Sequence, residues 1–369
     1  MFLLSFALSF ASVALASPHH KRAGELVVEL SGPSGSVNSA DLVLTASITN
    51  TGSEDVKVLK YGTILDDLPT RSFVVTNDAT QSQVPFTGVK LSVSMDNSPE
   101  AAYTTIASGQ TVNVTHDVSA IYDFGETGKY TFTPISSFRA AAPGVSLADI
   151  SSLSKVSADS SSIGVEISSV TKRELQSKHE SRSSDVQVLD KRAVVSCSSS
   201  SESSFISASY TEGKALASLS SSYVSSNGAS DSLYRSYFGS TATSTVIRVL
   251  NAVASESSSS RTLSCTDAYN VCDGNVIAYT VISTTDIYFC DIFFDEVPST
   301  SLCSGTTVAA RNVRGGTTLH ELQLTHAVAD TDDITYGCSA DQALSDSQSA
   351  INADNYNCFT TQVYQNEEC

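Results

Sequence analysis

Short β-branched segments separated by turn residues fill residues 23–140 of the chain. They follow one another at intervals near those of a sandwich of two packed sheets. The pattern therefore predicts a small, all-β, sandwich-like unit in the first half. The predicted strands lie within residues 25–32, 41–52, 56–62, 71–77, 89–95, 110–119 and 129–135.

The second half has a different pattern. Apolar residues recur at roughly helical spacing in residues 203–226 and 231–257, although both stretches are rich in serine. Two strand-like runs follow at 275–282 and 287–294, and further helical stretches begin near Thr317 and span about 341–356. We expect an α+β unit that is mostly helical and contains a small sheet.

A polar stretch with dibasic ends lies between the two halves. Lys172-Arg173 and Lys191-Arg192 bracket residues 174–190, which show no periodic apolar pattern. Such a segment is exposed and easily cut. The sequence predicts cleavage after Arg192, before Ala193, by a processing protease, which leaves a chain of 369 − 192 = 177 residues. A charged linker that nothing cleaves is the alternative.

The N-terminus has the features of a secretory signal peptide. An apolar run ends in Ala14-Leu15-Ala16, the small-x-small pattern of a cleavage site, although no basic residue precedes the run. No later stretch is long and apolar enough to cross a bilayer. We therefore expect a secreted, extracellular protein with a signal peptide at 1–16, a propeptide at 17–192 and a mature domain at 193–369.

Cysteine and charge are distributed unevenly. All eight Cys follow residue 196, and an even number in an exported protein predicts four disulfides, with 105 connectivities open. The formal net charge is −18, and residues 193–369 carry 6 Lys+Arg against 19 acids, or 6 − 19 = −13. This excess of acids argues against nucleic acid and anionic membranes and favours a basic partner.

The second half contains two histidines, His320 and His326, beside Glu321 and several aspartates. This composition suggests a metal site. Zinc proteases place two His four positions apart in H-E-x-x-H, on one face of a helix. His320 and His326 are six apart, which on an ideal helix separates them by about 240° and about 9 Å of rise. They cannot share a tetrahedral zinc unless the helix is interrupted.

Several blocks, in order, resemble the deuterolysins, the fungal neutral protease 2 family of zinc endopeptidases, also called aspzincins. The resemblance covers the whole precursor. The blocks are TNTGSEDVKVLKYGT, Lys191-Arg192, Cys265 to Thr280, Cys290-Asp-Ile, Thr317 to Glu321, Asp332 to Gly337, Ala343-Leu-Ser and Asn352 to Tyr356.

The resemblance implies a role for each residue that matches the family motif. His320, His326 and Asp333 would be ligands of one Zn²⁺ per mature chain, Glu321 the general base, and Tyr336 a donor to the developing oxyanion. Three protein ligands leave one zinc position open for water. The resemblance also implies protein substrates, with a preference for basic ones, and a β-rich propeptide. The implied disulfides are Cys197–Cys265, Cys272–Cys290, Cys303–Cys369 and Cys338–Cys358.

The sequence departs from the family motif at two places. Deleting Leu322-Gln323 would restore the family motif, and Asp330-Thr331 stands where the family has Gly-Thr. The extra pair is either a gene-model artefact, since a Leu-Gln codon pair can end in the CAG of an intron acceptor, or a real insertion. A real insertion requires a bulge in the helix or weakens the site. The alternative to an active protease is therefore an impaired pseudoprotease that acts as a secreted binding protein.

The remaining candidates receive plainer interpretations. Asp332, Asp341 and Asp346 are expected to be solvated, and Asp354 either supports the site or lies on a helix surface. The serine-rich run at 196–204 is expected to cap a helix or to form a loop rather than to supply a nucleophile. A serine–histidine hydrolase is disfavoured because His320 and His326 both lie in the segment that resembles a zinc-protease motif. We expect a monomer that meets protein substrates and a processing protease.

Overall fold

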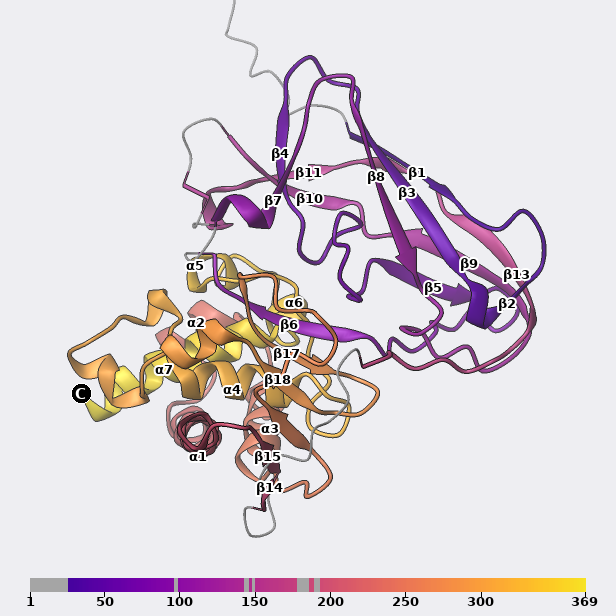
Figure 1. Ribbon diagram of the computed structural model, residues 1–369. Coiled ribbons are helices and arrows are strands. Elements are labelled where there is room, and N and C mark those ends of the chain that lie inside the picture. Colours follow the sequence, from indigo (N-terminus) through magenta and orange to yellow (C-terminus); the bar gives the residue numbers. More distant parts are fainter. Residues whose placement is uncertain (1–25, 96–98, 143–145, 148–149, 178–185, 189–192) are drawn as a thin grey trace, which may run out of the picture.

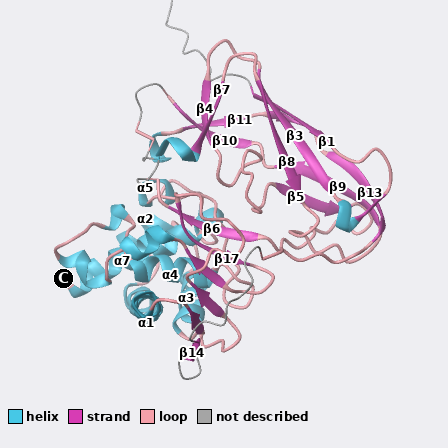
Figure 2. Ribbon diagram, in the orientation of Figure 1, coloured by secondary structure: helices cyan, strands magenta, loops and turns pink. Residues whose placement is uncertain are grey.

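The computed structural model describes residues 26–95, 99–142, 146–147, 150–177, 186–188 and 193–369. The chain is an α+β protein with two visibly different halves (Figures 1 and 2). Strands, loops and a few short 3-10 helices make up the half formed by residues 26–177, and the described α-helices α1 to α7 gather in the half formed by residues 193–369. We call these the N-terminal half and the C-terminal half. The predicted signal peptide at 1–16 and Lys191-Arg192 lie outside the described residues.

The N-terminal half is built from three four-stranded sheets, ordered β12-β1-β3-β8, β11-β10-β4-β7 and β2-β13-β9-β5. All seven predicted strands are present, but a sandwich-like arrangement is not confirmed, because the strands divide among these three sheets and β6 leaves for a fourth. The strands are β1 (Leu26–Ser31), β2 (Val37–Asn38), β3 (Val43–Asn50), β4 (Val56–Leu59), β5 (Phe73–Asn77), β6 (Val89–Val93), β7 (Tyr103–Ile106), β8 (Thr111–Asp117), β9 (Gly128–Pro134), β10 (Ser137–Ala141), β11 (Ser154–Ser157), β12 (Asp159–Ser160) and β13 (Ile163–Ser169).

The C-terminal half packs its helices beside a sheet ordered β14-β15-β16-β18-β17-β6. It combines helices with sheet and extended loops, so the description "mostly helical" is not confirmed. The helices are α1 (Ser200–Asn227), α2 (Ser232–Phe238), α3 (Thr243–Ala254), α4 (Arg314–Gln323), α5 (Cys338–Asp341), α6 (Asp346–Ser349) and α7 (Ala353–Glu368). Its strands are β15 (Val194–Ser196), β16 (Thr262–Ser264), β17 (Val276–Val281) and β18 (Ile287–Phe289), and β14 (Val186–Val188), which precedes this half, pairs with β15.

Local chemistry explains where the main helices begin and end. Ser199 caps α1 through its hydroxyl and the Glu202 N–H, as the serine-rich run predicted, and Gly228 ends that helix at a φ of 74°. The helix expected at 231–257 is divided, because Gly239 ends α2 at a φ of 55°. The helix expected at 341–356 is wrong: a capping box at Ser345 starts a separate short helix, and the last long helix, α7, begins only at Ala353.

Strand β6 connects the two halves. It belongs to the N-terminal half by sequence, yet it pairs antiparallel with β17 of the C-terminal half, with Leu91 opposite Tyr279 and Lys90 opposite Thr280. In Figure 1 the violet β6 leaves the upper sheets and runs beside the orange elements. It thereby covers the edge of β17 that the C-terminal half alone would leave unpaired.

Among the described residues, three large hydrophobic cores follow this arrangement, beside a small cluster of Leu302, Val308 and Val313. One fills the N-terminal half, and a second lies under helices α1, α3, α4 and α7. The third is shared, because Val89, Leu91 and Val93 of β6 pack with Val281 and Tyr288 of the C-terminal half. Burying these apolar side chains stabilises the contact between the halves.

The four disulfides in the structure have the pairing that the resemblance implies. They join Cys197 to Cys265, Cys272 to Cys290, Cys303 to Cys369 and Cys338 to Cys358. Ala193, the residue after the predicted cleavage point, is buried in the helical core. Within the part of the chain that the structure describes, no helix has both the length and the apolar character of a membrane span.

Candidate active site

Helix α4 supplies two adjacent functional side chains from the interior of the C-terminal half. Its residues 315–323 are all buried, and α1 crosses it so closely that a Cβ at Gly213 would lie 2.9 Å from the Gly315 carbonyl oxygen. This close approach fixes the position of the helix. His320 and Glu321, both completely buried, are thereby held next to β17 and β6.

His320 meets Asp333, which comes from the loop after α4. Their Nε2 and Oδ1 atoms are 3.0 Å apart. Ligands of a tetrahedral zinc, with bonds of about 2.0–2.1 Å, lie about 3.3 Å from one another. The nitrogen and oxygen donors are the types that zinc takes, so this pair fits two positions of a zinc site.

His326 does not join this pair. Helix α4 ends at Gln323, and the His326 side chain is 61% exposed, with Nδ1 2.8 Å from the carboxylate of Asp330. The structure therefore brings together two of the three expected zinc ligands. The cause is the spacing noted in the sequence, since six positions carry His326 past the end of the helix and away from His320.

The turn before Asp333 places an aspartate, Asp330, where the resembled family has a glycine. Asp330, which stands where the family has glycine, adopts a φ of 56°. Glycine takes this left-handed conformation readily, whereas for other residues it costs about 1–2 kcal/mol, less for Asp and Asn. Lys90 and His326 both lie within ion-pair distance of the Asp330 carboxylate, which favours this turn.

Burial changes the ionisation of the site. It raises the pKa of Glu321 to about 8, against the opposing effects of His320 and of a hydrogen bond from the Thr280 hydroxyl, 2.6 Å from Oε2. Burial lowers the pKa of His320, but Asp333 and Glu321 outweigh it, so that this pKa is raised. Three buried atoms of the site, Nδ1 of His320, Oε1 of Glu321 and Oδ1 of Asp333, have no hydrogen-bond partner among the described residues.

The backbone of β6 lies across these side chains. The Leu91 carbonyl oxygen is 3.1 Å from Nε2 of His320 and accepts a hydrogen bond of 3.1 Å from the Tyr336 hydroxyl. The Leu91 N–H donates to Oδ2 of Asp333 at 2.7 Å. The carbonyl of Leu91, a residue of the N-terminal half, thus faces both the predicted metal ligand His320 and the predicted oxyanion donor Tyr336.

The next peptide nitrogen faces the predicted base. The Ser92 N–H lies close enough to Glu321 to lower the pKa of that carboxyl, against the larger effect of burial. The Leu91–Ser92 peptide bond therefore has its oxygen beside His320 and its nitrogen beside Glu321. This is the arrangement that cleavage of an amide requires, because the oxygen gains charge and the nitrogen must receive a proton.

Behind the site, a buried ion pair fixes the predicted supporting residue Asp354. Its Oδ1 accepts from Arg311, with 3.0 Å to Nε, and its Oδ2 accepts from the Gly337 N–H at 2.6 Å. Asp354 is completely buried, so the helix-surface interpretation is wrong. Arg311 also donates to the Val93 carbonyl at 3.1 Å, and sequence analysis missed it because nothing near it in sequence marks an active site.

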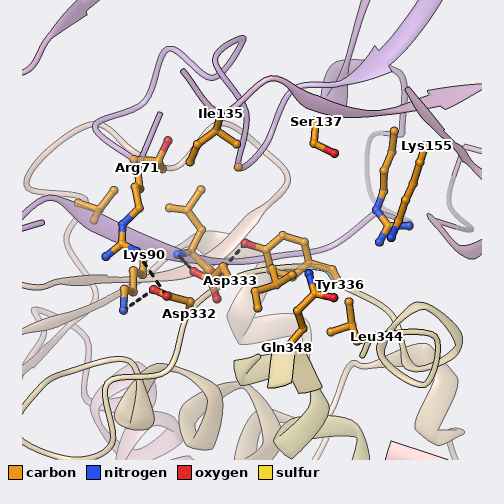
Figure 3. A pocket seen from close by; sticks show the side chains of 16 residues that line it. Arg71, Lys90, Ile135, Ser137, Lys155, Asp332, Asp333, Tyr336, Leu344 and Gln348 are labelled. Atoms are coloured by element: carbon orange, nitrogen blue, oxygen red, sulfur yellow. Dashed lines mark hydrogen bonds and ion pairs between the residues drawn. The ribbon is translucent and has the colours of Figure 1, made fainter. Parts of the chain in front are cut away.

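Two aspartates that we expected to be solvated, Asp341 and Asp332, are instead buried or ion-paired. Asp341 is completely buried and accepts from the Asn352 amide at 3.0 Å, and burial raises its pKa. Asp332 lies 2.9 Å from Lys90 and 3.4 Å from Arg71, at a cavity of about 370 Å³ between the two halves (Figure 3). Asp346 is an exposed residue that bonds to Ser240.

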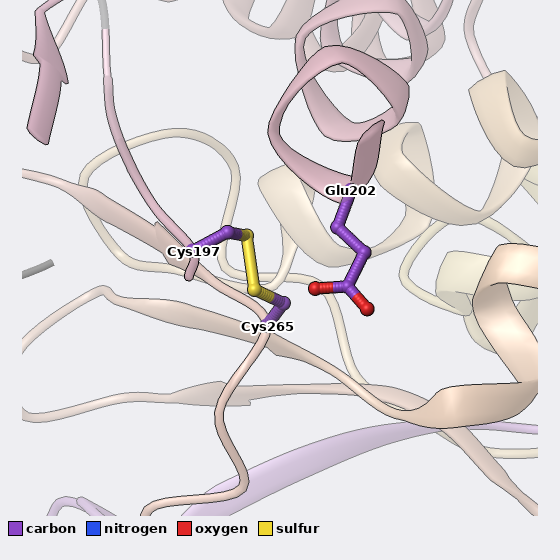
Figure 4. A group of neighbouring side chains, drawn as sticks. All are labelled: Cys197, Glu202 and Cys265. Atoms are coloured by element: carbon purple, nitrogen blue, oxygen red, sulfur yellow. A yellow bond between two sulfur atoms is a disulfide. The ribbon is translucent and has the colours of Figure 1, made fainter. Parts of the chain in front are cut away.

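Two other groups of potential metal ligands occur among the described residues, and both contain a disulfide. In one, Cys197 and Cys265 lie beside Glu202 (Figure 4). In the other, Cys338 and Cys358 lie beside Asp341. Zinc binds cysteine as the thiolate, which a disulfide does not offer. Within the described chain, the pair of His320 and Asp333 is therefore the better candidate for a metal centre.

Comparison with known proteins shows the family of the chain. The model of the Deuterolysin metalloprotease (M35) family matches residues 2–367. A neutral protease 2 homolog of Botryotinia fuckeliana is 32% identical over 342 residues, covering 89% of this chain and 90% of that protein. One of Aspergillus terreus is 32% identical over 335 residues, covering 88% of each.

A solved zinc peptidase from Grifola frondosa is 25% identical, covers 44% of this chain and 96% of its own, and superimposes with a TM-score of 0.35. The family match extends over nearly the whole chain, including the N-terminal half and the helix that carries His320 and Glu321. The chain belongs to the deuterolysin family of metalloproteases.

Proposed function

We propose that the chain is a secreted zinc metalloendopeptidase made as a zymogen, cleaved after Arg192, with a preference for basic protein substrates. The observation that carries this proposal is the position of the Leu91–Ser92 peptide bond over His320, Glu321 and Tyr336. In this proposal the N-terminal half is the propeptide, and β6 occupies the cleft as a substrate strand would.

Each side chain at the cleft has a task in this reaction. Bound zinc would supply a polarised carbonyl and a water of lowered pKa, with His320 and Asp333 among its ligands. The Thr280 hydroxyl holds Glu321 in place. Glu321 takes the proton of the attacking water and delivers it to the leaving nitrogen. Tyr336 keeps its proton and donates a hydrogen bond from its hydroxyl to the carbonyl oxygen as charge develops there.

The preference for basic substrates is supported by the charges at the contact between the halves. Cations of the N-terminal half meet acids of the C-terminal half: Lys60 lies 3.0 Å from Asp273, and Lys90 and Arg71 both pair with Asp332. Removal of the propeptide would free these carboxylates. Together with the net charge of −13 on residues 193–369, they favour cationic partners.

A second candidate is supported by the position of His326. Its exposure and its contact with Asp330 leave the metal with two of three ligands, so zinc affinity is expected to be low. The impaired form would keep the fold and bind proteins without cutting them. The two candidates differ in whether added zinc produces proteolysis.

The test uses secreted precursor that has been cut at the linker and then supplied with zinc. We expect zinc-dependent cleavage of a basic protein, lost on chelation and lost in Glu321→Gln, which keeps the metal-binding residues. An exposed acidic residue of the C-terminal half, Glu367 near the end of α7, supplies the matched control Glu367→Gln. Proteolysis that persists in Glu321→Gln removes this residue from the mechanism, and no proteolysis at saturating zinc favours the impaired form.

A further inference from the structure

Lys90 of β6 is a cation buried at the contact between the halves. Its side chain is 6% exposed, and Nζ lies 2.9 Å from Asp332 and 3.7 Å from Asp330. It also donates to two main-chain oxygens, those of Leu324 and Thr331. The ammonium group is thus surrounded by oxygen atoms, and Figure 3 shows it directed at Asp332.

All of these oxygens belong to one loop. Residues 324–332 follow helix α4 and lead to Asp333, so the loop starts and ends at the candidate active site. Two of the four oxygens are main-chain carbonyls, which keep their partial negative charge at every pH. The atoms that recognise Lys90 therefore belong to the C-terminal half and not to the strand that is recognised.

Lys90 has a fixed place relative to the candidate reaction. β6 pairs with β17 in register, and the carbonyl of the following residue, Leu91, faces His320 and Tyr336. Neighbouring side chains of a strand point to opposite faces, so Leu91 enters the shared core while Lys90 enters the loop. The loop receives the side chain of the residue immediately before the one whose carbonyl is attacked.

We propose that the loop of residues 324–332 is a substrate subsite for a lysine side chain, two residues before the nitrogen released by cleavage. Lys90 fills this subsite in the precursor, and a substrate lysine fills it after the propeptide leaves. The inference rests on the proposed function, since it names a position in substrates of that reaction. It is specific to this chain, because the loop begins just after the extra residues Leu322-Gln323.

The selectivity follows from the cost of leaving the oxygens of the buried Leu324 and Thr331, and the half-buried carboxylate of Asp332, without a donor. Lysine supplies three N–H donors and a charge to the carboxylate of Asp332 and the carbonyls of Leu324 and Thr331. Methionine has similar length but no donor, so the same oxygens would be desolvated without compensation. A site built to hydrogen-bond one group rejects an analogue that lacks it, and we expect at least ~100-fold weaker binding here.

The binding test uses the complete chain, nicked in the linker at 178–192, so that the halves are held together only by non-covalent contacts. We measure how fast the N-terminal half dissociates. Lys90→Met should dissociate at least ~100-fold faster, Lys90→Arg should be intermediate, and Asp332→Asn should be faster than the parent. Lys155→Met is the control, because Lys155 is exposed and lines the same cavity.

A cycle of Lys90→Met, Asp332→Asn and the double variant isolates the contact. The fold-increase in dissociation rate of the double variant should be smaller than the product of the fold-increases of the two single variants. Equal rates for Lys90→Met and Lys155→Met would overturn the proposal. The dissociation rate does not depend on proteolytic activity. It therefore tests the lysine subsite even if the chain cannot cut peptide bonds.

The cleavage test then separates this inference from the proposed function. The dissociated C-terminal half, supplied with zinc, is offered a peptide of residues 86–95 and the same peptide with methionine for Lys90. Cleavage between the residues equivalent to Leu91 and Ser92, faster with lysine, supports both proposals. Equal cleavage of the two peptides overturns the lysine subsite alone. Absence of cleavage, with Lys90 still needed for binding, overturns the proposed function alone.

Discussion

Deletion of Leu322-Gln323 should restore a zinc site in this chain. The deletion joins Glu321 to Leu324 and places His326 four positions after His320. On an ideal helix the angle between the two imidazoles then falls from about 240° to about 40°, and the rise from about 9 Å to about 6 Å. Two ligands on one face, with Asp333 opposite, can share a tetrahedral ion.

The structure indicates that the fold tolerates this change. Leu322 and Gln323 are buried, and the deletion brings Leu324 and Thr325, which are also buried, into their positions. One leucine replaces another in the helical core. The main loss is the hydrogen bond of 2.9 Å from the Gln323 amide to the Ala353 carbonyl, worth about 1 kcal/mol.

Zinc affinity is measured by competition with a chelator, on precursor nicked in the linker. Loss of a residue that merely orients a ligand costs 10–100-fold in metal affinity, so gaining a ligand should strengthen binding by at least ~100-fold. His326→Ala provides the control in both backgrounds. It should abolish the gain in the deletion variant and leave the parent unchanged.

Two results would refute this reasoning. Equal zinc affinity of parent and deletion variant would mean that the extra residues do not separate the ligands. A large loss of zinc affinity from His326→Ala in the parent would mean that the loop closes on the metal, and that the exposed position of His326 is not the zinc-bound one.

Three further predictions concern stability, each measured by chemical denaturation of the precursor. Burial raises the pKa of Asp66 to about 7 from an ordinary 3.8. The stabilising effect of this carboxyl is therefore present below about pH 4 and is lost as the pH rises to 7. Asp66→Asn should remove up to about 4 kcal/mol of this pH dependence of the unfolding free energy, and an unchanged pH profile would contradict the prediction. Gly213→Ala should cost about 1–3 kcal/mol, because its Cβ would meet the Gly315 carbonyl of α4. Replacing Cys338 and Cys358 by alanine opens a loop with a sequence separation of 20 and should cost about 3 kcal/mol.

Much of the local structure was predictable because neighbouring residues determine it. The seven β-branched segments all form strands, and Ser199 caps α1. Burial was not predictable where residues distant in the sequence determine it. The alternation in residues 89–93 is typical of a strand with one solvated face, and nothing local reveals that Lys90 and Ser92 are buried against the other half.

The candidate site shows the same division. His320, Glu321, Asp333 and Tyr336 were identified through the family resemblance, and the structure brings them together around β6. Asp341 was expected in solvent, because a lone Asp in a polar sequence is usually exposed. Its burial depends on Asn352, eleven positions away, and on the way the chain folds back onto α7.

The extra residues give zinc binding and lysine recognition opposite requirements. In the present chain Leu324 lies just past the end of α4, where its carbonyl accepts from the ammonium of Lys90. The deletion draws Leu324 into the helix, where its carbonyl is directed along the helix axis toward a backbone N–H. We therefore expect the variant that gains zinc affinity to lose the subsite.

Both quantities can be measured on one protein. In the deletion variant, with chelator present so that zinc does not hold the halves together, the N-terminal half should dissociate faster than in the parent, and Lys90→Met should then have little further effect. Zinc affinity should rise in the same protein. A variant that binds zinc tightly and still depends on Lys90 to the same extent would show that the loop oxygens do not require the extra residues. The two sites would then be independent, and the insertion would affect the metal alone.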